Sequence, residues 1–171
     1  MNRKLIISLF GVMFLSTYGC DGDVTTNGKV ELYLIQSYTT VDNSYQIVES
    51  SVVTAEIPLI EYDDILSYDS KECIFELSDR AINSIKALET SVYGLAFAIK
   101  ANDTLVYTGY FWPSYSSVSC DWVVVDPNMT GIGNTMQVSL GYPGLIQGKI
   151  IQDKRNDKRI VQILREDRKL K

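Results

Sequence analysis

The chain has 171 residues, a formal net charge of −5 and no histidine, and its length suits one domain with a hydrophobic core. The missing histidine excludes a serine–histidine nucleophile and removes the commonest metal ligand, so we expect no metal site and no cofactor. Residues 20–148 hold five basic and 17 acidic side chains, a balance that argues against nucleic acid as a partner.

The first twenty residues have the pattern of a secretory signal. Arg3 and Lys4 form a short positive start, and residues 5–15 follow without a charge. This apolar stretch is too short to span a bilayer comfortably, since a spanning helix needs about 20 apolar residues. Gly19 and Cys20 end the segment. We therefore expect residues 1–19 to be a signal peptide that is removed before Cys20.

The same segment resembles a bacterial lipoprotein signal, in which glycine or alanine precedes a cysteine that receives a diacylglycerol. Gly19 and Cys20 match that pattern, whereas Thr17 and Tyr18 depart from it, because an aliphatic residue and a small residue usually stand there. The resemblance implies lipidation of Cys20 and a membrane-anchored protein of the cell envelope, on the periplasmic side or the outer-membrane surface. The alternative is an ordinary signal peptide with a chance cysteine.

Residues 20–28 are short and polar, and we expect them to tether the lipid to a domain that covers residues 29–171. The alternation of apolar and polar residues predicts a strand over 29–36. Residues 45–57 contain β-branched clusters and are expected to be extended. The acidic stretch 61–70 lacks the spacing of an EF-hand loop, so the interpretation is a solvated loop and not a cation site.

The middle of the chain combines strands with one helix. A strand over 72–77 leads to Ser78, whose hydroxyl can accept from the first turn of a helix expected over 78–90. Apolar residues recur along that segment at helical spacing. Strands over 95–100 and 104–110 follow, and an asparagine–aspartate pair between them predicts a hairpin turn.

Two further strands are predicted over 121–125 and 136–140. A C-terminal helix is expected over 157–167, with a short strand as the rival interpretation. It lies in a basic segment, 149–171, which holds nine basic and four acidic side chains and is interpreted as a solvated face. Runs of strands with few helices indicate a single α+β domain with a largely antiparallel sheet.

Two cysteines follow Cys20 in the sequence. Cys73 and Cys120 both fall in segments predicted as strands, so a cross-strand bond is geometrically possible. An oxidising envelope compartment would permit a disulfide. The alternative is two separately buried thiols.

The domain also resembles a known module, the head of the first periplasmic domain of the SecD protein-export subunit. The matching pieces are Val30–Ile35, Phe75–Ser78, Ala81–Leu88, Gly94–Ile99 and Asp103–Thr108. The resemblance implies a head-like fold that contacts other polypeptides. SecD has several membrane spans and couples a proton gradient to export, and this chain has no further apolar segment long enough to span, so the resemblance implies no transport activity.

Aromatic residues crowd the segment that follows the strand predicted over 104–110. Tyr110, Phe111, Trp112 and Tyr115 are candidates for binding a partner, because aromatic side chains bring a large contact area at low entropic cost. Phe111 and Trp112 suit the end of the core better, whereas Tyr110 and Tyr115 are the better candidates for exposure.

Thr104 is a candidate glycosylation site. The tripeptide Asp103-Thr104-Leu105 resembles a short O-glycosylation signal of some bacterial secreted proteins, and its position in a predicted hairpin turn favours exposure.

The sequence favours a lipid-anchored, non-enzymatic binding module that contacts another macromolecule, either a protein or a glycan. The alternative is an envelope hydrolase that uses two carboxylates or a serine–lysine pair. Its candidate residues are Asp63 with Asp64, Glu72 with Glu76, and Lys100 with Ser114, Ser116, Ser117 or Ser119. A concave pocket with convergent ionisable groups would favour the hydrolase.

Overall fold

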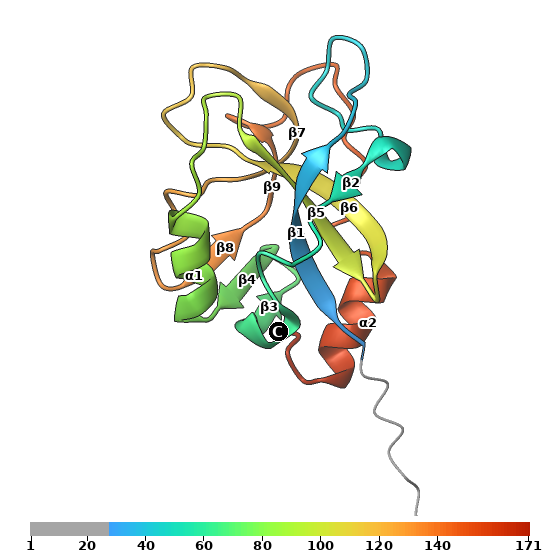
Figure 1. The fold of residues 1–171 in the computed structure, drawn as a ribbon, viewed down its shortest axis with the longest axis vertical. Helices are drawn as coiled ribbons and strands as arrows, with labels where there is room; N and C mark the ends of the chain where they lie inside the picture. Colours follow the sequence, from blue (N-terminus) through green and yellow to red (C-terminus); the bar gives the residue numbers. More distant parts are fainter. Residues whose placement is uncertain (1–27) are drawn as a thin grey trace, which may run out of the picture.

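Two sheets and two helices make up residues 28–171, the part of the chain that the computed structural model describes (Figure 1). The larger sheet has the strand order β2-β1-β5-β6-β7-β9 and the smaller β3-β4-β8. The larger sheet contains β1 (Val30–Ser37), β2 (Val53–Thr54), β5 (Leu95–Ala101), β6 (Thr104–Phe111), β7 (Cys120–Val125) and β9 (Ser139–Tyr142). The smaller contains β3 (Ile65–Asp69), β4 (Ile74–Leu77) and β8 (Thr135–Gln137), and the helices are α1 (Asp79–Lys86) and α2 (Lys158–Glu166). The α+β class and the predominance of antiparallel pairing are confirmed.

The centre of the larger sheet is the predicted hairpin of β5 and β6. Asn102 and Asp103 both have positive φ angles, of 50° and 62°, as a two-residue turn between twisted antiparallel strands requires. β6 and β7 run parallel, and they pair only at their ends, where Tyr110 faces Val124 and Phe111 faces Val125.

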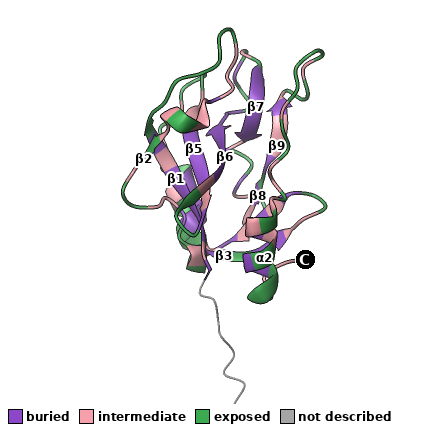
Figure 2. Ribbon diagram, turned by 90° about the vertical axis from the view of Figure 1, so that its right-hand side faces the viewer, coloured by how far each residue is buried: buried purple, intermediate pink, exposed green. Residues whose placement is uncertain are grey.

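The larger sheet is covered on both faces, as the buried colouring of β5, β6 and β7 in Figure 2 indicates. Phe97 and Ile99 of β5 enter a first core, which α1, α2 and the smaller sheet complete. Ala96 and Ala98 enter a second core on the opposite face, which the loop after β1 covers with Ile47. Alternate residues of one strand therefore reach two separate cores.

Both predicted helices are present, and their caps are the expected residues. The Ser78 hydroxyl accepts a hydrogen bond from the Ala81 amide at 3.2 Å, and Asp157 caps α2 in the same way. The expectation of a helix to residue 90 is wrong, since α1 ends at Lys86. The Leu88 amide bonds back three residues to Ile85, which tightens and closes the last turn.

The acidic stretch 61–70 is not the solvated loop that its charges predict. It contains a 3₁₀ turn, η2 (Tyr62–Asp64), and then strand β3. The Asp64 carboxylate is buried and accepts hydrogen bonds from the Ser78 hydroxyl and from the Arg80 guanidinium. Burial of a carboxylate is tolerated because these donors satisfy it.

Two other segments differ from their predictions. Residues 45–57 are mostly irregular and contain only a 3₁₀ turn, η1 (Glu49–Ser51), and the short β2. Residues 136–140, predicted as one strand, divide between β8 and β9 in different sheets. The break falls at Val138, whose amide bonds to the carbonyl of Cys73.

Of the two arrangements left open for Cys73 and Cys120, this structure has the separately buried thiols and not the disulfide, since both cysteines are buried and free. Cys73 occupies a turn before β4, with a φ of 55°, and is not part of the predicted strand. It lies near Tyr107, which belongs to the first core, whereas Cys120 packs in the second core. The larger sheet therefore separates the two thiols.

The predicted signal peptide, Cys20 and the tether up to residue 27 lie outside the described residues. Gly28, the first described residue, packs closely against α2, since a Cβ atom there would lie 2.7 Å from Cγ1 of Ile163. Within residues 28–171, neither helix has the length and hydropathy needed to cross a bilayer.

Candidate functional site at the loop end

The structure brings only one of the four predicted aromatic residues to the surface. Tyr115 is 64% exposed, whereas Tyr110, Phe111 and Trp112 are each at most 1% exposed. The expectation that Tyr110 is exposed is wrong, because β6 continues to Phe111 and its side chains alternate between the two cores. Tyr110 and Trp112 pack in the second core, and Phe111 packs in the first.

Three loops meet at the end of the domain that lies at the top of Figure 1, and we call this region the loop end. The loops comprise residues 38–52, 87–94 and 112–119, and the segment 143–150 lies beside them. A hydrogen bond joins the loop 112–119 to the loop 87–94, since the Ser116 hydroxyl donates to the carbonyl of Val92 at 2.7 Å. The loop end is therefore a connected surface built from distant parts of the sequence.

Tyrosine side chains gather on this surface, and we call Tyr38, Tyr45, Tyr93 and Tyr115 the tyrosine patch. Tyr93 and Tyr115 are each more than 60% exposed, Tyr38 is 38% exposed and Tyr45 is half-buried. The Tyr38 and Tyr45 rings each meet the buried Tyr110 ring edge-on, with centroids 6.0 Å apart. The buried aromatic core thus supports the exposed rings.

Tyr45 connects the core to the exposed part of the patch. Its ring lies edge-on to Trp112, with centroids 4.9 Å apart, and its backbone amide donates to Asp121 at 2.7 Å. Burial raises the pKa of Tyr45, and the nearby Cys120 and Tyr93 side chains raise it further. The hydroxyl therefore stays protonated at neutral pH and offers both a donor and an acceptor.

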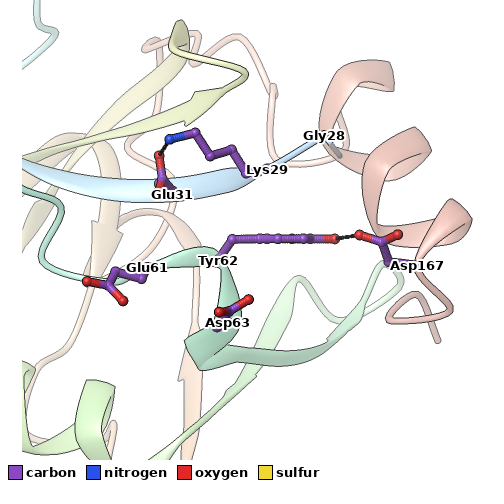
Figure 3. Close-up of a pocket in the computed structure, with 7 residues that line it drawn as sticks. All are labelled: Gly28, Lys29, Glu31, Glu61, Tyr62, Asp63 and Asp167. Carbon is purple, nitrogen blue, oxygen red and sulfur yellow. Dashed lines mark hydrogen bonds and ion pairs between the residues drawn. The ribbon is translucent and has the colours of Figure 1, made fainter. Parts of the chain in front are cut away.

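The opposite end of the domain contains a pocket of about 480 Å³, shown in Figure 3. It lies where the described chain begins, beside Gly28 and Lys29. We call it the acidic pocket, because four of its lining residues are carboxylates: Glu31, Glu61, Asp63 and Asp167.

Three of these four carboxylates are held by partners within the fold. Glu31 accepts from the Tyr33 hydroxyl at 2.8 Å and pairs with Lys29 at 3.0 Å. Glu61 pairs with Arg80 at 2.8 Å. Asp167 accepts from the Tyr62 hydroxyl at 2.6 Å, an interaction drawn in Figure 3, which joins the end of α2 to η2. The pocket is thus lined by side chains that already make structural contacts.

The structure separates the carboxylate pairs predicted for a hydrolase. Asp63 is exposed in the acidic pocket, whereas Asp64 is buried against Arg80. Glu76 accepts from the Ser67 hydroxyl at 2.7 Å and pairs with Lys171 at 2.6 Å. Glu72 is exposed in the turn before β4, so one carboxylate of each pair, Asp64 or Glu76, is engaged by a cation and a hydroxyl of the fold, while the other faces solvent.

The predicted serine–lysine pair is not assembled. The Lys100 ammonium donates to the Thr54 hydroxyl at 2.7 Å and lies 4.4 Å from the centroid of the Tyr33 ring. The serines at 114–119 instead belong to the loop end, where the Ser116 hydroxyl bonds to backbone carbonyls. In the described part of the chain, no three metal-binding side chains converge.

Thr104 is exposed at the first position of β6, next to the hairpin turn. Its exposure is compatible with modification, and glycosylation there stays a prediction.

Tyr38, Tyr45 and Tyr93 were missed by the sequence reasoning. They stand singly in polar stretches, and only the meeting of three loops brings them together. The sequence contains one signal for these exposed tyrosines, which is that each stands beside small polar residues in a segment expected to be a loop.

Comparisons with known proteins give no relative: no family model matches the chain, and neither curated proteins nor solved structures include a match.

Proposed function

We propose that this protein is a lipid-anchored, non-enzymatic binding module of the cell envelope, which contacts another macromolecule through the tyrosine patch. One observation carries the proposal. The loops that carry the exposed tyrosines lie at the end of the domain opposite the start of β1, near which the described residues begin (Figure 1).

Anchoring at Cys20 would place the two ends of the domain differently with respect to a membrane. An extended chain covers at most about 3.6 Å per residue, so the link from Cys20 to Gly28 reaches about 29 Å. The end with the acidic pocket would then lie nearest the bilayer, and the loop end would face away from it. A surface that faces away from its own membrane is accessible to a partner in the envelope.

The chemistry of the patch supports binding. Tyrosine side chains give large contact areas with few rotatable bonds, and they provide hydroxyls that a protein or a glycan can hydrogen-bond. Tyr93 and Tyr115 are exposed over most of their surface and are not needed to fill either core. Supporting rings beneath Tyr38 and Tyr45 restrict their movement, which lowers the entropic cost of binding.

Site-specific crosslinking in living cells of the native host tests the proposal. A photo-reactive phenylalanine analogue replaces Tyr93 or Tyr115 in the full precursor, and matched controls carry it at Leu66 in β3 or Ile132 before β8, which are also exposed. We expect a discrete crosslinked product from the loop end only. Equal crosslinking from all four positions would contradict a dedicated surface.

The mass of the same protein tests the anchor. Diacylglycerol on an N-terminal Cys20 is expected, and Cys20→Ser should release the protein from the membrane fraction. A mature chain that begins elsewhere and lacks lipid would overturn this part of the proposal.

A further inference from the structure

Two hollows lie side by side at the loop end and share one wall. Their volumes are about 450 and 310 Å³, and Ser44, Asp121 and Lys149 border both of them. The larger hollow is also lined by Asn43, Tyr45 and Ser119, and the smaller by Asp42 and Gln46. Each has the size of a site for a small ligand or for one unit of a longer one.

The shared wall is a fixed ion pair at the start of β7. The Asp121 carboxylate is buried, and it pairs with the Lys149 ammonium at 2.8 Å and accepts from the Tyr45 amide at 2.7 Å. Burial alone would raise the pKa of Asp121, but hydrogen bonds from Lys149, Tyr45 and Ser44 outweigh it and lower the pKa. The Asp121 side chain is only 7% exposed, whereas the Lys149 side chain is 44% exposed, so the pair presents the Lys149 ammonium as a hydrogen-bond donor whose position Asp121 fixes.

The charges around the hollows disfavour an anionic ligand. Asp42 and Asp121 supply two carboxylates, and Lys149 supplies one ammonium that is already paired. The other polar side chains are neutral amides and hydroxyls, which both donate and accept hydrogen bonds. This combination suits a neutral ligand with many hydroxyl groups.

An aromatic ring completes the larger hollow. Tyr45 is held edge-on by Trp112 at 4.9 Å and by Tyr110 at 6.0 Å, so its position is fixed by the second core. A fixed ring beside hydrogen-bonding groups can pack against the apolar C–H face of a sugar while its hydroxyls bind the ion pair and the amides.

We infer that these two hollows bind a neutral oligosaccharide, with successive sugar units on either side of the Asp121–Lys149 pair. The inference rests on the proposed function and deepens it, since it assigns a glycan to the loop end. A chain of repeating units accounts for two adjacent hollows with a common wall, because neighbouring units can both approach the Lys149 ammonium, which borders both hollows.

Titration of the purified full chain with chitotetraose, and separately with cellotetraose, tests the inference. Amide NMR signals report which residues the sugar contacts. We expect saturable shifts with at least one sugar, concentrated at residues 41–46, 119–121 and 146–150. Gln46→Ala and Lys149→Gln should each weaken binding at least about tenfold, equivalent to about 1.4 kcal/mol.

Two controls keep a loss of binding distinct from a loss of folding. Lys71→Gln removes an exposed ammonium from the turn between β3 and β4 and should leave the affinity unchanged. Gln46→Ala changes a half-buried side chain outside both cores, so its spectrum should retain the native dispersion.

Two outcomes would overturn the inference. One is the absence of saturable shifts with both sugars, and the other is a response of these residues to a lysine-rich peptide only. If crosslinking from Tyr115 still captures a protein in either case, the proposed binding function stands and only the glycan assignment fails.

Discussion

At the acidic-pocket end, Glu31, Glu61 and Asp167 each have a partner within the fold, whereas at the loop end Tyr93 and Tyr115 are exposed over most of their surface. In the first region, Asp167 joins the end of α2 to η2, Glu61 joins the start of η2 to α1, and Glu31 is held within the segment of β1. The second presents side chains that neither core requires. The more highly charged end is thus the structural one, and the end with fewer charges is the better candidate for recognition.

The largest expected effect comes from the aromatic support of the loop end. Trp112 is fully buried, and its indole N–H donates to the Val118 carbonyl at 3.2 Å. Trp112→Ala should lower the free energy of unfolding by about 3–5 kcal/mol, since it leaves a cavity and removes one of the two hydrogen bonds to that carbonyl. Urea denaturation measures the change. A loss below about 1 kcal/mol would mean that the second core does not depend on this ring.

The next effect concerns the buried carboxylate behind the acidic pocket. Burial of Asp64 raises its pKa, but hydrogen bonds from Arg80 and Ser78 outweigh burial and lower the pKa below its usual value. A lowered folded-state pKa stabilises the protein above the unfolded pKa, about 3.9, and that stabilisation is lost as the pH falls through the folded value.

Asp64→Asn should therefore cost about 1.5–3 kcal/mol at pH 7 and flatten the loss of stability as the pH falls below about 4. Urea denaturation at pH 7, 4 and 2.5 provides the comparison. Asp63→Asn is the matched control, because the neighbouring carboxylate is exposed. If the free energy of unfolding fell as steeply at low pH in the Asp64→Asn variant as in the unchanged protein, other carboxylates would be responsible for the loss of stability in acid.

A smaller effect is expected at the first turn of α1. The Ser78 hydroxyl caps the helix and also donates to Asp64, so Ser78→Ala should cost about 1 kcal/mol or slightly more. Ser84→Ala in the same helix is the control and should be nearly neutral, because its hydroxyl only bonds back to the Arg80 carbonyl. Similar losses in both variants would point to a general effect on α1 and not to the cap.

Much of the fold could be predicted from local patterns. The hairpin of β5 and β6, the strand β7 and the caps at Ser78 and Asp157 follow from alternation, turn residues and helix-start signals. β3 could not be predicted, because the charges before it indicate a loop, and burial of Asp64 depends on hydrogen bonds from Ser78 and Arg80, which lie farther along the chain.

The candidate site was less predictable than the fold for a physical reason. Whether Tyr110 is buried depends on the second core, which exists only because the loop after β1 folds over the larger sheet with Ile47. Whether Tyr93 lies near Tyr45 depends on two loops that are remote in sequence. Local sequence patterns predict neither the burial of Tyr110 nor the nearness of Tyr93 to Tyr45. Of the four aromatic residues predicted as binding candidates, Tyr115 is therefore the one that the structure leaves exposed.

The smallest effect on stability is expected at the tyrosine patch itself. Tyr93→Ala and Tyr115→Ala remove exposed rings, so each should change the free energy of unfolding by less than about 0.5 kcal/mol. The Tyr115 hydroxyl donates to the Thr90 carbonyl at 3.4 Å, a long contact at the surface that adds little. If either variant instead destabilised the domain by more than about 2 kcal/mol, its ring would be a structural part of the loop end. The contrast with the acidic pocket would then disappear, since both ends would use their side chains to hold the fold together.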